Sequence, residues 1–405
     1  MLILSQYFHP EPNGSAPPVT DFAQWLAENG YAPHVITARP SYPERRVYPG
    51  YRRGERDREN WRGIAVRRLN APVTDEPGLG GRLVNEAGFA AALLAARALG
   101  EPAHPAVLAV CPSVLAALAA GAFRKKGGRL VVLVHDIQSG LSPLAGGRRV
   151  RGVLRRLERA ALNRADHVVT LSERMAEVLR DIGVTTPIDV LPPQLDVAGF
   201  QVRPEPQGRT QLLYSGAFGR KQGLDQLIDA ASALIRRGAQ FDMVLRGAGG
   251  VEAELSARIE ADGLPHVRIE PLVAREQLCE ALGAASVHLV PQAAEGGDFA
   301  VPSKVFTIMA AGRPFAATAA PGSPLARLAE ESGAGLFAPP GDPDALAGAL
   351  ERLLGDPRLR RAMGEAGRRY VENHVDRSIV CPALAAILHD APDGMDHLPL
   401  RAGVG

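Results

Sequence analysis

The stretch HLVPQAAEGGDFAVPSKVFTIMAAGRPFAAT, residues 288–318, contains the alternation that decides the fold. A short apolar run leads into a loop of glycines and acids, then into a helical pattern that ends near Gly312, and then into a second apolar run. Strands that are joined through a helix run parallel, because the helix carries the chain back to the edge at which the first strand began. We therefore predict a strand, a helix and a parallel strand here, with Pro302, Ser303 and Lys304 at the start of the helix.

The same alternation extends over most of the chain. Residues 1–195 and 208–374 each contain apolar runs of strand length separated by amphipathic helical patterns, which is typical of parallel sheets covered on both faces. Residues 191–210 collect prolines and glycines without periodicity and are predicted to link two domains. Residues 375–391 are predicted to form a helix that packs back on the first domain. The expected fold is α/β, with two Rossmann-like domains in series.

Length and composition restrict the class of protein. A chain of 405 residues with 46% hydrophobic and 22% charged residues is long enough for two cores, which excludes a disordered or fibrous protein. The best candidate for a membrane span, residues 106–123, is interrupted by Pro112 and is better explained as a strand followed by a helix. Cys111, Cys279 and Cys381 lack metal-ligand spacing and are predicted to be reduced core thiols. With no leader segment visible, the sequence predicts a cytoplasmic protein.

Positive charge is concentrated in one region although the net charge is only +2. Residues 39–68 contain ten arginines and four acids, and a second basic block begins at Gly146. Two interpretations remain open, namely solvated arginine faces and a surface for anionic lipid head groups or a phosphorylated acceptor. Few aromatic residues are interleaved with the arginines, so we predict no nucleic-acid partner.

Four junctions between a strand and a helix carry the candidate functional residues. Ligands of such sheets bind at the carboxyl ends of the strands, where helix N-termini present free N–H groups. The first junction contains Gly14, in either a plain connection or a loop that closes on a ligand. The second ends an apolar strand with His135, which is placed either to contact a hydroxyl group or to bond nearby backbone together with Asp136.

The third junction contains two neighbouring cations. Arg220 and Lys221 follow a glycine-bearing turn at the predicted start of a helix, where cations are unfavourable because the helix N-terminus is itself positive. A bound anion would resolve this conflict, and an exposed basic turn is the alternative. The fourth junction is the helix start at Ser303 and Lys304.

Two segments together resemble the glycosyltransferases of family 4, which have the GT-B fold. They are YSGAFGRKQGLDQLIDAA, from Tyr214, and VPSKVFTIMAAGRPFAAT, from Val301. The segment from Tyr7 to Pro43 matches the same group in order and spacing, so the resemblance covers about residues 1–375. It is strongest to the transferases of colanic-acid and O-antigen assembly, and it indicates the fold and the transferase class but not the sugar.

The resemblance implies that the two Rossmann-like domains face each other across a cleft. It also implies a retaining transfer from a nucleotide-diphosphate sugar held in that cleft, without a metal ion or another cofactor. Arg220 and Lys221 would neutralise the charge that grows on the leaving diphosphate, and His135 would contact the donor sugar. Gly312-Arg313-Pro314 would be a structural turn. The donor-binding residues would be Gly14, Gly216, Arg246, Gly247, Asp298, Pro302, Ser303, Lys304 and Thr307.

The sequence departs from the family pattern at the ribose site. Many members have two glutamates eight residues apart around this helix start, and those positions are Phe299 and Thr307 here. One hydroxyl group replaces a carboxylate, so ribose recognition is expected to be weaker or to come from elsewhere. Glu295 and Asp298 either substitute for the missing carboxylates or are ordinary loop acids.

An active sugar transferase is the leading hypothesis. The acceptor is either a lipid-linked or polysaccharide precursor, which would bring peripheral contact with the anionic inner face of a membrane, or a small-molecule metabolite. The alternative is a non-catalytic relative that binds a nucleotide sugar in a degenerate donor site. A nucleotide-sugar epimerase is disfavoured, because the sequence presents no second acid–base constellation of carboxylates.

Overall fold

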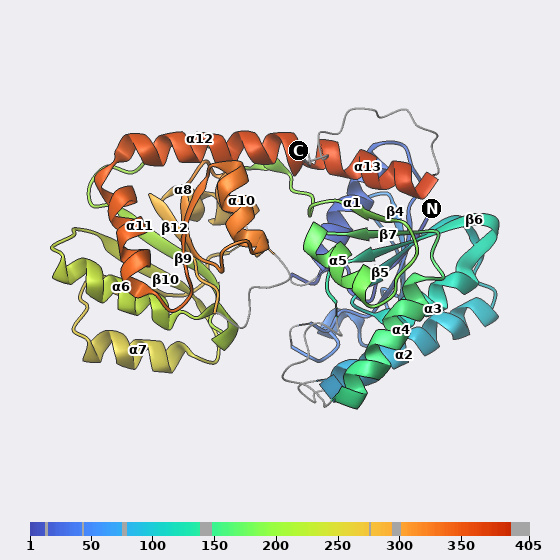
Figure 1. Ribbon diagram of the computed structural model, residues 1–405. Coiled ribbons are helices and arrows are strands. Elements are labelled where there is room, and N and C mark those ends of the chain that lie inside the picture. The colour runs from blue at the N-terminus through green and yellow to red at the C-terminus, as the bar shows by residue number, and fades with distance from the viewer. Residues whose placement is uncertain are drawn as a thin grey trace. The chain divides into compact units, whose positions relative to one another are not determined.

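The computed structural model describes residues 1–12, 15–42, 44–74, 79–137, 148–274, 277–293 and 301–389. The chain divides into two compact units (Figure 1). The first contains Met1–Pro192 and Val380–Gly405, the latter described as far as residue 389, and the second contains Pro193–Ile379. Each unit is built on one sheet, and the predicted α/β class with two Rossmann-like domains is confirmed.

The sheet of the first unit has eight strands in the order β3-β4-β2-β1-β5-β6-β7-β8. Its described pairs are parallel except the pair of β3 with β4. Strand β3 was not predicted, because this edge strand is rich in charge and lacks an apolar run. The strands are β1 Leu2–Leu4, β2 His34–Ala38, β3 Arg58–Trp61, β4 Ile64–Leu69, β5 His104–Cys111, β6 Arg124–Val134, β7 His167–Thr170 and β8 Ile188–Val190.

Alternate residues of the central strands enter cores on the two faces of this sheet, as the period of two requires. On β5, Val107 and Ala109 join the core that α2, α3, α4 and α5 cover. Leu108 and Val110 join the core that α1 and α13 cover, where Leu384 packs with residues of α1. The helices are α1 Ala16–Glu28, α2 Leu79–Ala98, α3 Val114–Ala120, α4 Arg148–Leu162, α5 Glu173–Asp181 and α13 Arg377–His389, with short 3₁₀ turns at Pro49–Tyr51 and Gly121–Phe123.

The sheet of the second unit has six parallel strands in the order β11-β10-β9-β12-β13-β14. Six apolar runs predicted these strands, and β12 and β13 with α9 between them form the unit predicted from residues 288–318. The strands are β9 Gln211–Ala217, β10 Asp242–Ala248, β11 Val267–Glu270, β12 Val287–Val290, β13 Phe315–Thr318 and β14 Gly335–Ala338.

Helices cover both faces of this second sheet as well. Residues of α6, α7 and α11 share one core with Leu212 and Tyr214, and residues of α9, α10 and α12 share the other with Val290. The helices are α6 Asp225–Arg236, α7 Glu252–Ala261, α8 Leu278–Gly283, α9 Lys304–Ala310, α10 Pro324–Ser332, α11 Pro343–Gly355 and α12 Pro357–His374, with 3₁₀ turns η3 at Val197–Gly199 and η4 at Arg220–Gln222. Helix α11 ends before Asp356, whose carboxylate accepts from Arg358 N and starts α12 as a new helix.

The predicted linker is largely packed on the second unit. Val197 is buried in the core of that unit, and the buried Arg313 donates hydrogen bonds to the carbonyl oxygens of Arg203 and Pro204. Glu205 accepts from Arg360 at 2.6 Å. The segment is therefore held by specific contacts rather than free, and Arg313 of the Gly-Arg-Pro turn has the structural position expected for it.

Two further expectations concern cysteines and membrane spans. Cys111 and Cys381 are buried as predicted, whereas Cys279 is only partly buried on the short helix α8, and its predicted core position was wrong. Within the described part of the chain, no helix is both long and apolar enough to cross a membrane.

Candidate active site

The second sheet reverses its strand order between β9 and β12. From β9 the chain adds β10 and β11 on one side, and it then returns to place β12, β13 and β14 on the other. Ligands of open α/β sheets bind at such a switch point, in the crevice outside the carboxyl ends of the two strands. Arg220 and Lys221 lie in the loop that follows β9, and Lys304 is the first residue of α9, the helix that follows β12. Topology therefore brings the third and fourth predicted junctions to one place.

Hydrogen bonds join the two loops directly. The amide of Ala293 donates to Lys221 O at 3.1 Å, and Gln226 Nε2 donates to Gln292 O at 3.2 Å. The same Gln226 accepts from Gly341 N through Oε1 at 2.7 Å. Gln226 and Gln292 are buried, so these bonds fix the position of the Lys221 backbone relative to the chain that follows β12. Neither glutamine could be recognised from the sequence, because their polarity resembles that of any loop or helix surface.

Lys304 is the most unusual cation of this site. Its Nζ lies 4.0 Å from the centre of the Tyr214 ring, and it faces the Cα of Gly216. Burial lowers the pKa of Lys304 to about 8. No ion pair of Lys304 with a carboxylate is found among the described residues, and an aromatic face compensates only part of the cost of burying an ammonium group. An anionic ligand at the switch point would supply the missing partner.

Gly216 and Gly247 lie opposite each other at the ends of β9 and β10. A methyl group on Gly216, whose φ is +153°, would lie 2.6 Å from Lys304 Nζ. A methyl group on Gly247 would collide with the carbonyl oxygen of Gly216 and with Phe218. Both glycines are therefore required for close packing, and Gly216 also leaves the space that Lys304 occupies.

The cationic pair of the third junction is solvent-facing. Arg220 and Lys221 are exposed and lie in η4, not in a helix N-terminus, because Gly223 takes a left-handed φ of +60° and α6 begins only at Asp225. The predicted helix start was therefore wrong by one turn. Arg220 pairs with Glu254 at 3.0 Å, with both side chains largely exposed, so this ion pair is weak and open to exchange for a ligand.

Arg246 is not an open cation. Its guanidinium is largely buried and donates to Glu270 at 2.7 Å, and Arg246 and Arg268 together hold the pKa of Glu270 below its usual range. Its proposed donor contact must compete with this ion pair, so the structure supports Arg246 less than Lys304.

The start of α9 is a single tight turn. The helix has seven residues, Ser303 makes no side-chain cap, and the amides of Val305 and Phe306 donate to Pro302 and Ser303. The hydroxyl group of Thr307 donates to Lys304 O at 2.8 Å. The hydroxyl proton of Thr307 is therefore already donated within the helix, so Thr307 Oγ1 could only accept a hydrogen bond from a ribose hydroxyl.

In the first unit the strand order reverses between β1 and β5, and His135 follows the neighbouring β6. Its amide donates to Cys111 O at 3.4 Å, and burial lowers the pKa of His135 to about 4. The imidazole is therefore neutral near pH 7, and it suits a hydrogen bond to a hydroxyl group better than it suits proton donation as a cation.

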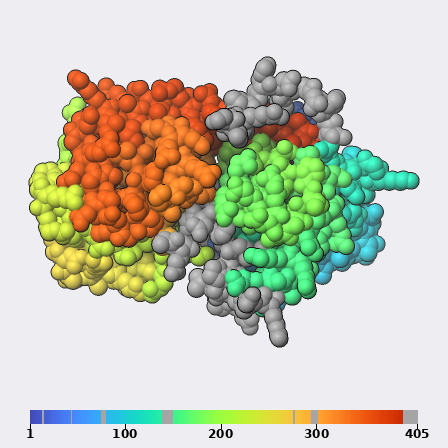
Figure 2. All heavy atoms as spheres, in the orientation of Figure 1, coloured from blue at the N-terminus to red at the C-terminus, as the bar shows by residue number. Residues whose placement is uncertain are grey.

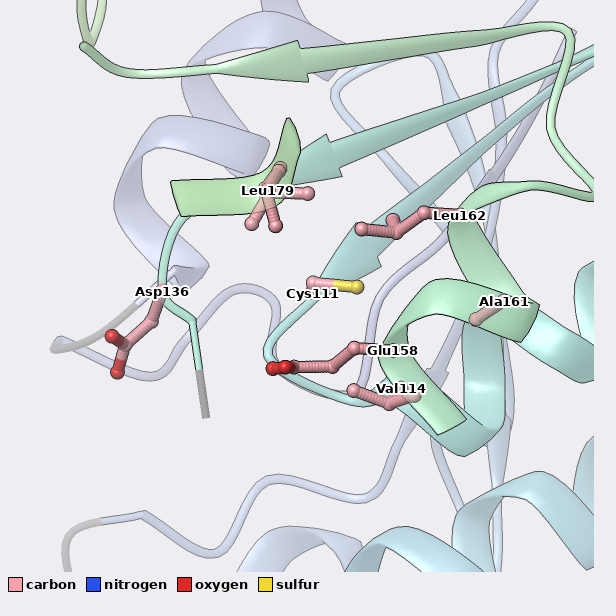
Figure 3. A pocket seen from close by; sticks show the side chains of 8 residues that line it. Cys111, Val114, Asp136, Glu158, Ala161, Leu162 and Leu179 are labelled. Atoms are coloured by element: carbon pink, nitrogen blue, oxygen red, sulfur yellow. The ribbon is translucent and has the colours of Figure 1, made fainter. Parts of the chain in front are cut away.

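A small pocket lies next to His135, between the ends of β5 and β6 and the helices α3, α4 and α5 (Figure 3). Apolar side chains form most of its wall, and Asp136 and Glu158 add two carboxylates. Burial and the nearby Glu158 raise the pKa of Cys111, so this thiol stays protonated. Gly14, Glu295, Asp298 and Phe299 lie outside the described residues.

The whole chain is similar in fold to several solved structures. Sucrose-phosphate synthase from Thermosynechococcus elongatus gives a TM-score of 0.75 at 21% identity, over 96% of this chain and 98% of that one. HepE of Anabaena, solved in complex with UDP-glucose, gives a TM-score of 0.68 at 18% identity, over 96% and 99%. WaaG, a glycosyltransferase of lipopolysaccharide biosynthesis, gives 0.66 at 16% identity, over 96% and 100%. These similarities, with the two doubly wound units, define a protein of the GT-B fold.

Sequence comparison identifies the family. Models of the glycosyl transferase 4-like domain and of glycosyl transferases group 1 match residues 13–194 and 199–370. WcaI of Escherichia coli strain K12, named for colanic acid biosynthesis, is 28% identical over 404 residues, which cover 94% of this chain and 97% of WcaI. The 2-deoxystreptamine glucosyltransferase of Streptomyces kanamyceticus is 29% identical over 372 residues, which cover 85% and 91%. The chain belongs to the family 4 glycosyltransferases of the GT-B fold.

Proposed function

We propose that this glycosyltransferase moves a hexose-like sugar from a nucleotide-diphosphate donor to an acceptor hydroxyl with retention of configuration. The observation that carries the donor assignment is the partly buried Lys304, which lies against Tyr214 and Gly216 at the switch point without a carboxylate partner among the described residues. A diphosphate is the anion that suits a cationic crevice at the carboxyl ends of parallel strands. HepE, which shares the fold, was solved with UDP-glucose, and this supports a donor of the same class.

The catalytic contribution of this site would be electrostatic. As the bond between the sugar and the diphosphate breaks, negative charge grows on the leaving phosphate, and cations that are already in position stabilise it. Lys304 would hold the diphosphate from the buried side. Lys221 and Arg220 would approach it from the exposed turn, and Arg220 would exchange Glu254 for phosphate oxygen. The leaving phosphate would take the proton of the acceptor hydroxyl, so that no separate general base is required.

Because these cations can neutralise the diphosphate, we propose transfer without a metal ion or another cofactor. His135 would donate or accept one hydrogen bond at a donor-sugar hydroxyl in its neutral form. Initial rates that stay unchanged after treatment with EDTA would support the metal-independent mechanism, and rates that are lost and then restored by Mg²⁺ would contradict it.

The first experiment is calorimetric binding of UDP, GDP, dTDP and CDP to the wild type. Selective binding of one nucleotide fixes the base and supports a donor site. The sugar is then identified by transfer from a panel of donors that carry this base, and NMR of the product gives its configuration. An inverted product would exclude the retaining mechanism. Binding without transfer to any acceptor class would support the alternative of a non-catalytic nucleotide-sugar-binding relative.

The acceptor is proposed to be either a lipid-linked or polysaccharide precursor or a small-molecule metabolite. WcaI is named for colanic acid and the Streptomyces relative for 2-deoxystreptamine. The similar proteins therefore include one example named for each class of acceptor. Transfer to a polyprenyl-diphosphate sugar and to a free aminocyclitol, measured with the same donor, would decide between them.

Peripheral contact with an anionic membrane is proposed to use α4 rather than residues 39–68. Several arginines of residues 39–68 are engaged inside the first unit, because Arg39 pairs with Asp57 and the buried Arg68 pairs with Glu59. Helix α4 instead combines exposed arginines with Val150 and Val153, which are 38% and 54% exposed. It lies on the surface of the first unit below α5 in the view shown (Figure 2). Such a mixture suits the interface of an anionic bilayer.

Sedimentation with phosphatidylglycerol vesicles tests this contact. Arg155→Glu with Arg156→Glu on α4 should abolish binding, whereas Arg52→Glu with Arg53→Glu in the other basic region should weaken it less. Equal loss in both double variants, or binding to neutral vesicles, would contradict the choice of α4.

A further inference from the structure

The amino ends of the first sheet contain a cluster of metal-ligating side chains. His34 is the first residue of β2, and His104 is the first residue of β5. Strand β1 lies between them in the sheet, and Glu101 follows the end of α2, three residues before His104. All three positions lie at the amino ends of parallel strands, whereas the proposed transfer chemistry lies at the carboxyl ends. The cluster is therefore separate from the candidate active site.

The distances fit joint coordination of one ion. One ligand atom from each of the three residues lies within 4.8 Å of the others. His34 Nδ1 and Glu101 Oε1 are 3.6 Å apart, which is too long for a hydrogen bond. Two ligands that each lie about 2.0–2.1 Å from a tetrahedral zinc ion are separated by roughly 3.3–3.5 Å. The pair is thus close to the separation that a shared ion produces.

The remaining polar contacts of the cluster leave its interior available. His104 Nε2 is buried and has no hydrogen-bond partner among the residues that the structure describes, which is uncommon for a buried ring nitrogen. The two imidazole rings are 5.6 Å apart and tilted by 58°, so they do not stack on each other. Arg67 contacts the other carboxylate oxygen, Oε2 of Glu101, and this ion pair orients the carboxylate with Oε1 toward His34.

We propose that His34, Glu101 and His104 bind a Zn²⁺ ion. Two imidazoles and one carboxylate are borderline ligands that suit zinc, whereas Mg²⁺ and Ca²⁺ prefer oxygen ligands alone. Three protein ligands leave a fourth position for water. The ion would tie the start of β2 to the segment between α2 and β5, which lies far from β2 in the sequence. Its role would be to stabilise the first unit, and the positive charge of Arg67 would moderate its affinity.

The test uses the full chain without a histidine tag, stripped of metal by a chelator. Zn²⁺ binding is measured by competition with a chromophoric chelator, and the bound metal is counted by elemental analysis. We expect one equivalent of Zn²⁺ and a higher melting temperature in its presence, with no such effect of Mg²⁺. His34→Gln and His104→Gln should each weaken binding by about 10–100-fold or more, as the loss of a ligand or its support does elsewhere.

Two controls keep this test decisive. His266→Gln replaces an exposed histidine of the second unit and should bind Zn²⁺ as the wild type does. Glu101→Gln also removes the ion pair with Arg67, so its melting temperature is compared in the absence of metal to separate folding from binding. If the wild type binds no zinc, or if His104→Gln binds it as tightly as the wild type, the site does not exist. Loss in His266→Gln as well would indicate adventitious surface binding and would equally refute the proposal.

Discussion

Lys304 Nζ lies 4.0 Å from the centre of the Tyr214 ring, at the point where the second sheet reverses its strand order. The lysine comes from the start of α9 and the tyrosine from the middle of β9, so 90 residues of sequence separate two groups that touch. A partly buried ammonium group over an aromatic face keeps its charge at a cost, and a bound anion would remove most of that cost.

Lys304→Met should weaken nucleotide-diphosphate binding. One charge-assisted contact to phosphate contributes about 1.5–3 kcal/mol, which corresponds to roughly 10–150-fold in the dissociation constant. The same change should leave the unliganded fold intact or raise its melting temperature, because it removes a partly buried charge without a carboxylate partner among the described residues. Calorimetry measures the affinity, and Lys126→Met in the first unit is the matched control. Unchanged affinity would remove Lys304 from the donor site.

Nucleotide-diphosphate affinity should fall as the pH rises through about 8, the pKa of Lys304. Above this pH the free site loses the positive charge that the phosphate needs. The effect on stability has the opposite sign. Since the folded pKa is below the unfolded value, the unfolded chain binds more protons between about 8 and 10.5, and this lysine raises the free energy of unfolding as the pH rises through that window. Lys304→Met should flatten both profiles, and a wild-type affinity that does not change between pH 7 and 9 would contradict this assignment.

Lys221→Ala should separate turnover from stability. An exposed cation adds less than about 0.5 kcal/mol to folding, while loss of a preorganised charge at the leaving group costs roughly 10²–10³ in turnover. Steady-state rates and thermal unfolding are compared with those of Arg236→Ala, a change at the exposed end of α6. A rate within twofold of the wild type would show that Lys221 has no catalytic role.

Gly216→Ala should weaken donor binding by displacing Lys304, and it should also lower stability because a φ of +153° is strained for a residue with a side chain. The added methyl group would lie 2.6 Å from Lys304 Nζ and must displace it. Gly348→Ala, at a position in α11 where the methyl group meets no atom within 4 Å, is the control and should bind nucleotide normally. If Gly216→Ala is combined with Lys304→Met, the two losses should not add, because both remove the same contact. Additive losses would show that the glycine acts independently.

Thr307→Val should change nucleotide affinity little, because the hydroxyl proton of Thr307 is already donated to Lys304 O. Thr307→Glu should tighten binding if this position faces the ribose, since a carboxylate accepts two hydrogen bonds there. Calorimetry with the matched nucleoside monophosphate, which keeps the ribose and loses one phosphate, isolates the ribose contribution. A large loss in Thr307→Val would show instead that the threonine itself binds the ribose.

The order of strands and helices, the two-domain division and the positions of the four junctions could be read from the sequence. These features depend on the local alternation of apolar and polar residues and on the turn residues that interrupt it. Both signals extend over only a few positions, so they can be recognised without knowing the tertiary structure. The same local patterns failed at single element boundaries and at one edge strand. The left-handed Gly223 separates Arg220 and Lys221 from α6, Asp356 divides a continuous helical pattern, and β3 has too few apolar residues to indicate a strand.

The sequence alone determined that this is an α/β chain with a cationic turn, a histidine at a strand end and a Pro-Ser-Lys helix start. Only the tertiary structure decided which cations are available to bind an anionic ligand. Arg246 is paired with Glu270, and Arg313 donates a hydrogen bond to the backbone before β9. Lys304 instead lies against the Tyr214 ring. It also brought His34 and His104 together. The physical reason is that burial and pairing arise from contacts between strands distant in the chain, and no local pattern of residues records which partner each charge will find.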